Sequence, residues 1–300
     1  MANTPIKQSV RALLAEIVDY AGLFPPSQLP MNEAVANYAR YKNSSYSWML
    51  GRFVVPVARL EEFADEAKVF FKQDGKVWKL SVLASEDIYE TVRGIKDFNT
   101  SYAPNAVCDA LEVKANTGEL IKEIAASIPS QLKTYFEIPI DESLADSVLT
   151  LATSGQRAKI RTGGVTADAF PTAEQIARFM QTCLAANVPF KATAGLHHPL
   201  RCTKPLTYEK DTPRATMHGF LNVFLAAGFL LQGCKIGLIN ELLGDESAQN
   251  FIFDENSISW REHSLNVAQL KNLRTKNIIS FGSCSFDEPI ADLISLNILN

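Results

Sequence analysis

Two lysines stand inside short apolar runs that have the character of β-strands. Lys159 lies in RAKIRTG, residues 157–163, and Lys191 lies in PFKATAG, residues 189–195. A lysine in a water-poor site near another cation has a lowered pKa, because both the low polarity and the like charge disfavour the ammonium form. The neutral amine that results can attack a carbonyl carbon and form a Schiff base, which allows an adjacent C–C bond to break or form.

Acidic residues in similar runs are candidates for moving protons in that chemistry. Glu112 lies in VCDALEVK and Glu137 in LKTYFEIP. Glu137, together with Asp19 in EIVDYAG, is a candidate contact to the substrate. A carboxylate close to a Schiff base can carry protons to and from its intermediates. We therefore expect Glu112 or Glu137 to have this role, and we expect Arg161, two residues after Lys159, to bind an anionic group of the substrate. The same charges are also typical of an ion-pair network that fills the interior of a barrel.

Eight such runs alternate with amphipathic helical patterns along the chain. The segment TAEQIARFMQTCLAAN from Thr172, for example, has apolar residues at helical spacing. This alternation indicates βα units around a parallel sheet, and the runs start about every 25–30 residues, as in a (β/α)8 barrel. We therefore predict an α/β fold with a single (β/α)8 TIM barrel domain over residues 1–300. The predicted strands are residues 16–22, 49–56, 77–84, 107–114, 132–139, 157–163, 189–195 and 278–284.

The regular spacing breaks between the seventh and eighth runs, where the connection is longer than one βα unit. It contains HGFLNVFLAAGFLLQGCKIGLI, which is interrupted by Asn222, Gln232 and Lys235 and therefore reads as a buried helix rather than a membrane span. We predict a helical insertion at about residues 203–275. Because barrels carry their chemistry at the C-terminal ends of the strands, an insertion after strand seven could cover the active mouth.

Composition narrows the class of partner. The chain has 29 basic and 33 acidic residues, a net charge of −4 and no long run of like charge, so neither nucleic acid nor a membrane surface is indicated as a partner. The five cysteines are widely spaced without a C-x-x-C pair, and the N-terminus lacks a signal-peptide pattern, which together predict a cytoplasmic protein. We expect a small-molecule substrate, namely a carbonyl or phosphorylated compound, and no cofactor; the sequence is compatible with a homo-oligomer.

Loops of small residues follow strands six, seven and eight, where barrels usually bind phosphate. Backbone N–H groups in such loops can hold an anion, although glycine is also the ordinary residue of plain turns. The candidate phosphate contacts are Gly163, Gly164, Gly195, Gly282 and Ser283.

Histidine and cysteine residues near these loops offer further contacts. His197 and Arg201 are candidates for binding a substrate anion. His197 and His198 are adjacent, and no H-x-x-x-H or H-E-x-x-H spacing occurs, so we predict no metal site. Cys284 could act as a nucleophile if a histidine lay close, although free cysteines more often serve as small packing residues.

Several of these pieces resemble, in chain order, motifs of the deoxyribose-phosphate aldolase family, which are class I aldolases on a (β/α)8 barrel. KIRTGG at Lys159 is similar to the family's K-T-S-T-G motif on strand six, and KATAGLHH at Lys191 is similar to its K-A-[AS]-G-G-I-R motif on strand seven. ALEVKAN, LKTYFEIPIDE and FGSCS resemble its strands four, five and eight. The resemblance implies that Lys159 is the Schiff-base lysine, that Lys191 lowers the pKa of Lys159, and that Glu112 is the acid of the proton relay.

Departures from these motifs imply an altered substrate. Glu112 stands where the family has Asp, Arg161 replaces a small hydroxyl residue, and AGLHHPLR replaces a glycine-rich loop. The first hypothesis is a class I aldolase-like lyase that acts on a small carbonyl or sugar-phosphate substrate. The second is a non-catalytic barrel that binds an anionic metabolite through Lys159, Arg161, Lys191 and His197. A metal-assisted lyase that uses the histidines is a third.

Overall fold

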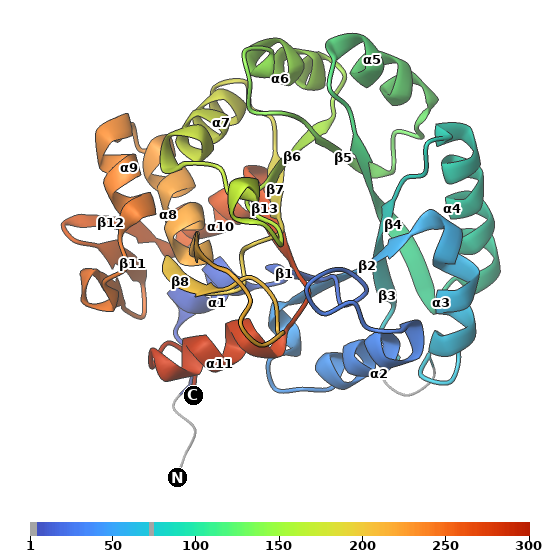
Figure 1. Cartoon of the computed structure of the whole chain (residues 1–300), viewed down its shortest axis with the longest axis horizontal. Helices are drawn as coiled ribbons and strands as arrows, with labels where there is room; N and C mark the ends of the chain where they lie inside the picture. Colours follow the sequence, from blue (N-terminus) through green and yellow to red (C-terminus); the bar gives the residue numbers. More distant parts are fainter. Residues whose placement is uncertain (1–4, 72–74) are drawn as a thin grey trace.

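Eight parallel strands close into a barrel with helices around it (Figure 1). The computed structural model describes residues 5–71 and 75–300. Neighbouring strands follow one another in the order β1-β13-β7-β6-β5-β4-β3-β2, so the predicted (β/α)8 barrel is confirmed. Each predicted run coincides with one barrel strand to within a few residues. The strands are β1 (Val18–Tyr20), β2 (Leu50–Pro56), β3 (Trp78–Leu83), β4 (Ala106–Lys114), β5 (Lys133–Glu137), β6 (Arg157–Arg161), β7 (Phe190–Thr193) and β13 (Ile278–Ser283).

Each barrel strand is followed by a helix that covers the outside of the sheet. Helix α7 shows how the sequence specifies these helices. Thr172 and Gln175 cap its first turn reciprocally, and the apolar face that includes Phe179 and Met180 is buried. The barrel helices are α2 (Met31–Lys42), α3 (Leu60–Ala67), α4 (Ile88–Tyr102), α5 (Gly118–Ser127), α6 (Leu144–Thr153), α7 (Ala173–Ala185), α8 (Phe220–Leu231) and α11 (Asp287–Ser295). Helix α1 (Gln8–Leu14) precedes β1, α10 (Val267–Lys276) precedes β13, and short 3-10 turns are η1 (Ser47–Met49), η2 (Val57–Arg59), η3 (Ala167–Ala169) and η4 (Ala248–Asn250).

The long connection between β7 and β13 contains strands as well as helices. The expectation of a helical insertion was therefore incomplete, because strands of three or four residues are too short to show a clear alternating pattern. A hairpin precedes α8, and α9 with a three-stranded antiparallel sheet follows it, on the outer side of α8 (Figure 1). These elements are β8 (Cys202–Pro205), β9 (Arg214–Met217), α9 (Ile236–Gly244), β10 (Phe251–Phe253), β11 (Ser257–Trp260) and β12 (His263–Asn266).

The two parts of this connection lie at different ends of the barrel. In the hairpin loop, the Tyr208 hydroxyl lies 3.8 Å from Cys284 Sγ, just after β13, so this loop reaches the C-terminal mouth. The turn between β10 and β11 instead contacts α1, where the Ser9 N–H donates to the Glu255 carbonyl at 3.0 Å. The hairpin loop is therefore the part of the extension that can influence access to the mouth.

Helix α8 is the apolar segment that the sequence predicted to be buried. All residues from 220 to 229 are buried, and Phe220 stacks on Phe281 of β13 with ring centroids 4.9 Å apart. Burial of such side chains stabilises the fold by about 1.5–3 kcal/mol each. Within residues 5–71 and 75–300, no helix is both long enough and apolar enough to cross a membrane.

Candidate functional site

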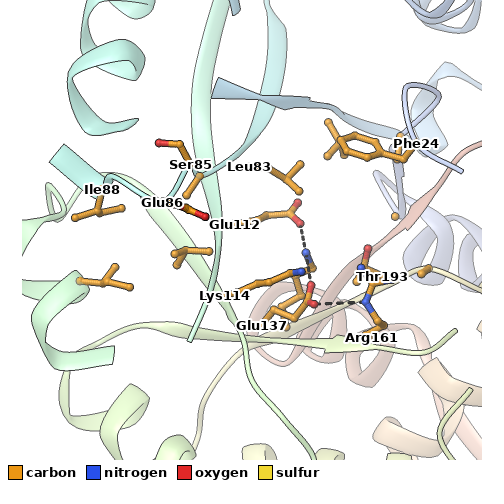
Figure 2. Close-up of a pocket in the computed structure, with 18 of the residues that line it drawn as sticks. Phe24, Leu83, Ser85, Glu86, Ile88, Glu112, Lys114, Glu137, Arg161 and Thr193 are labelled. Atoms are coloured by element: carbon orange, nitrogen blue, oxygen red, sulfur yellow. Dashed lines mark hydrogen bonds and ion pairs between the residues drawn. The ribbon is translucent and has the colours of Figure 1, made fainter. Parts of the chain in front are cut away.

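A pocket of about 790 Å³ opens at the C-terminal ends of the barrel strands, the end at which (β/α)8 enzymes carry their chemistry. Its floor includes Lys159 on β6, with Glu112 on β4 and Glu137 on β5. Figure 2 shows Glu112 next to Leu83, with Glu137 further down the view and Ile88 to the left. The pocket therefore combines charged groups in its floor with an apolar wall, as small-molecule sites usually do.

Lys159 is placed by strand register. It lies opposite Glu137 on β5 and opposite Lys191 on β7. Because side chains alternate along a strand, these three residues point to the same face, which is the barrel interior. The Lys159 side chain is only 5% exposed, and its Nζ lies 2.8 Å from both Glu112 Oε2 and Glu137 Oε2. The sequence placed the two lysines on successive strands that face the barrel interior, and the strand register sets them opposite each other.

Lys191 lies deeper in the barrel and is almost completely buried. Its Nζ contacts Asp19 Oδ2 at 2.5 Å and Glu112 Oε1 at 2.8 Å. Burial by itself would lower the pKa of Lys191, but Asp19 and Glu112 outweigh this effect and raise the pKa above its usual value. Lys191 is therefore an ammonium ion at neutral pH, which is the state in which it can disfavour a second positive charge nearby.

Glu112 links the two lysines through different oxygen atoms. Oε2 contacts Lys159, whereas Oε1 accepts hydrogen bonds from Lys191 and from the Ser81 hydroxyl at 2.7 Å. Burial disfavours the ionised carboxylate, but Lys159 and Lys191 outweigh it and hold the pKa of Glu112 well below its usual range. Glu112 is therefore fully ionised at neutral pH, and it is held in one orientation by two hydrogen bonds and an ion pair.

Asp19 is held in the same way beneath Lys191. Its Oδ2 accepts from the Ser280 hydroxyl at 2.7 Å, and its Oδ1 accepts from the Arg52 N–H at 2.8 Å. Burial raises the pKa of Asp19, and Lys191 and Arg52 more than offset that effect, so the pKa is lowered overall. Asp19 thus anchors Lys191 and does not line the pocket itself.

Carboxylates and cations alternate through the whole cluster, which we call the interior charge chain. Arg161 forms its outer end, with Nε 3.4 Å from Glu137 Oε1 and a side chain that is 49% exposed (Figure 2). The guanidinium therefore remains able to contact a solute in the pocket. In order, the interior charge chain consists of Asp19, Lys191, Glu112, Lys159, Glu137 and Arg161.

His197 and Cys284 form a second polar cluster in the pocket lining. The Nδ1 atom of His197 lies 3.9 Å from Cys284 Sγ, 3.4 Å from Glu288 Oε2 and 3.3 Å from Ser283 Oγ. Burial alone would lower the pKa of His197, but Cys284 and Glu288 outweigh it and raise the pKa to about 9. Burial raises the pKa of the Cys284 thiol, and the contact with His197 more than reverses this effect. A histidine thus does lie beside Cys284, which is the condition for an activated thiol.

The glycines predicted to bind phosphate have two different surroundings. Gly164 and Gly282 line the pocket. Gly163 and Gly195 instead pack against each other, because a Cβ on either would lie 2.9 Å from the Cα of the other. Gly195 also has φ +72°, a conformation that glycine adopts readily. These two glycines therefore allow the loops after β6 and β7 to approach closely. Ser283 is buried behind the pocket, where its Oγ contacts His197.

Arg201 is not brought to the pocket. Its Nη1 atom lies 3.4 Å from both Glu246 Oε1 and the Gly244 carbonyl, near the end of α9. The sequence did not reveal that Arg201 is held at the end of α9. Also missed from the sequence were Ser81 and Ser280, whose hydroxyl groups donate to the buried carboxylates of Glu112 and Asp19. The feature that could have indicated them is a hydroxyl residue inside an otherwise apolar strand.

Comparison with known proteins gives no family assignment, since no family model matches the chain and no curated protein matches it significantly. Over residues 5–71 and 75–300, no group of three or more His, Cys, Asp or Glu side chains is arranged to hold a metal ion. The function is therefore inferred from the pocket and from the interior charge chain.

Proposed function

We propose that this protein is a class I aldolase-like lyase in which Lys159 forms a Schiff base with a small carbonyl substrate. The observation that carries the proposal is the position of the Lys159 amine, which is buried in the floor of a 790 Å³ pocket and contacts two carboxylates at 2.8 Å. A lysine amine is nucleophilic only after it loses a proton, and each carboxylate is within range to accept that proton.

Glu137 is the better candidate for the mobile proton carrier. Its Oε1 makes one long contact to Arg161, and its Oε2 contacts Lys159, whereas Glu112 is also held by Lys191 and Ser81. Burial raises the pKa of Glu137, and Lys159 more than offsets it, so the pKa is lowered while Lys159 carries its charge. Once the proton has moved, that charge is gone, and the acid form of Glu137 can return a proton to an intermediate.

The proposed reaction starts when Glu137 removes a proton from the ammonium group of Lys159. The amine then attacks the carbonyl carbon, and the resulting carbinolamine loses its hydroxyl group as water, with a proton supplied by Glu137, to leave a protonated imine. The imine draws electrons from the neighbouring bond. When a carboxylate removes the proton from a hydroxyl on the β-carbon, the bond between the α- and β-carbons breaks and an aldehyde leaves. Protonation of the enamine and hydrolysis by water release the second product and restore Lys159.

Two further residues support this reaction without contacting the breaking bond. Lys191, kept charged by Asp19 and Glu112, holds Glu112 Oε1 and thereby positions the Glu112 carboxylate beside Lys159. Arg161, half exposed at the pocket edge, is placed to bind an anionic end of the substrate. We therefore expect a carbonyl compound that also carries a carboxylate or phosphate group.

A non-catalytic barrel that binds an anionic metabolite is the second candidate. It is favoured by the complete pairing of the interior charge chain, because every ammonium group there has at least one carboxylate partner, as in a structural network. The substitution Lys159→Arg separates the two functions. Arginine keeps the charge but cannot form the imine, so we expect loss of lyase turnover with retained ligand binding; turnover by the variant comparable to wild type would refute the Schiff-base proposal.

A further inference from the structure

A second pocket, of about 600 Å³, lies at the opposite end of the barrel from the candidate active site. It is formed where β5 and β6 begin and where α1 and α10 pack beside each other. We call it the basal pocket. The whole chain has a net charge of −4, yet the lining of the basal pocket is strongly positive. Its charged lining residues are Arg11, Arg52, Lys133, Arg157, Lys271, Arg274 and Glu16.

The acidic side chains near the basal pocket neutralise only part of this charge. Asp109 accepts two hydrogen bonds from Arg52, at 2.6 and 2.7 Å, and lies 3.7 Å from Lys133. Glu16 pairs with Lys79, at 3.1 Å. In the part of the chain that the structure describes, the remaining four cations have no carboxylate oxygen within 4.0 Å. These four are Arg11, Arg157, Lys271 and Arg274.

Arg274 is the most informative of the four because it is only 8% exposed. Its Nη1 and Nη2 atoms donate to the Ala15 carbonyl at 3.1 Å, and Nη2 also donates to the Ile279 carbonyl. Its Nε is buried without a hydrogen-bond partner. Burial lowers the pKa of Arg274 to about 10, so the group is still charged at neutral pH. A buried charge without a counter-charge is costly, and an anion from solution would supply one.

We propose that the basal pocket binds a small multivalent anion that carries two or more phosphate groups. Guanidinium groups pair with phosphate through two parallel hydrogen bonds, and Arg11 and Arg157 supply two such groups around one cavity, while Arg274, whose terminal nitrogens donate to backbone carbonyls, adds a buried positive charge. A volume of 600 Å³ suits a ligand of this size. A concave pocket favours a small molecule over an extended polymer. This site is separate from the Lys159 pocket, and it does not depend on the proposed lyase activity.

The test is isothermal titration of the full-length protein with sodium tripolyphosphate at fixed ionic strength. Wild type is expected to bind one equivalent. The double variant Arg157→Gln/Lys271→Gln, which changes two lining residues, is expected to bind at least tenfold more weakly. The matched control is Lys122→Gln, which removes one exposed cation on α5, far from the basal pocket, and should bind as wild type does. Circular dichroism and thermal denaturation establish that each variant is folded.

Three results would overturn the proposal. The first is no saturable binding of tripolyphosphate by folded wild type, and the second is equal affinity in the double variant. The third is equal affinity for sulfate at the same ionic strength, which would mean that a single small anion satisfies the pocket. If the double variant does not fold, the single variant Lys271→Gln serves instead, because this side chain is exposed on α10; we expect its binding to weaken about threefold, and unchanged binding would count against the proposal.

Discussion

Replacement of Glu112 by glutamine tests the interior charge chain at its centre. The amide has one oxygen, which can keep the hydrogen bonds of Oε1 from Lys191 and Ser81. Its NH₂ group must then face Lys159, whose Nζ lies 2.8 Å from Oε2 in the wild type. The variant therefore loses the ion pair with Lys159, weakens the hydrogen bond from Lys191 and leaves the buried cluster with one excess positive charge. Removal of one partner from a buried ion pair lowers the free energy of unfolding by about 3–5 kcal/mol, and we expect Glu112→Gln to fall in this range at pH 7.

The difference in the free energy of unfolding between wild type and Glu112→Gln should change with pH in a defined direction. Because the folded pKa of Glu112 lies well below its usual value of 4.5, its contribution to stability is present above about pH 4.5 and is lost as the pH falls toward the folded value. The difference between wild type and Glu112→Gln should thus be constant near neutral pH and shrink by about 1.4 kcal/mol per pH unit below pH 4.5.

Urea denaturation of both proteins at pH 7 and at pH 3.5 measures this difference in the free energy of unfolding. The matched control is Glu66→Gln, which changes an exposed carboxylate on α3 and should alter the free energy of unfolding by less than about 0.5 kcal/mol. A deficit for Glu112→Gln as small as that of the control, or one that grows in acid, would refute the electrostatic account of the site.

The remaining predictions concern the rest of the pocket. Cys284→Ser should lower the pKa of His197 from about 9, which NMR titration of the ring protons of His197 would follow; an unchanged pKa would contradict the pairing of the two side chains. Because a pKa of about 9 lies above the usual 6.5, the stability that His197 contributes is present below pH 6.5 and is lost as the pH rises through about 9. Arg161→Gln should raise KM for anionic substrates roughly tenfold with little change in kcat, and an unchanged KM would remove Arg161 from the binding site. Gly163→Ala places a Cβ 2.9 Å from the Cα of Gly195 and should lower the free energy of unfolding by about 1–3 kcal/mol. Gly237→Ala, which has open space around its Cβ, should not lower it. Equal melting temperatures of the two variants in calorimetry would contradict the close approach of the loops after β6 and β7.

The barrel could be predicted from the sequence because each strand-like run and each helical pattern is contained in a short segment of the chain. A lysine or glutamate inside an apolar run such as ALEV or AKIR is recognisable, and alternation along each strand indicates which residues share a face. That rule predicted that Lys159 and Lys191 share the interior, whereas their direct pairing across β6 and β7 is set by the strand register. The position of Glu112 between the two lysines could not be predicted, because it depends on the side-chain lengths and stagger of strands that are far apart in sequence.

Other features escaped prediction for physical reasons that differ from one to the next. The sheet formed by β10, β11 and β12 has strands of three or four residues, which is too short for a clear period. Arg201 lies in a connection whose direction is set by tertiary packing. The positive charge of the basal pocket is invisible in the sequence, since its residues are spread from Arg11 to Arg274 and the overall composition is acidic.

Borohydride trapping tests the central claim most directly. Folded protein is incubated with small aldehydes, ketones and sugar phosphates, reduced with sodium borohydride and analysed by intact-mass and peptide mass spectrometry, beside the matched variant Lys159→Arg. We predict a stable adduct on the peptide that contains Lys159, with a mass gain equal to the carbonyl compound less one oxygen atom, and no adduct in the variant. Absence of an adduct across the panel, or an adduct of equal yield in Lys159→Arg, would contradict the proposal that Lys159 is a Schiff-base lysine.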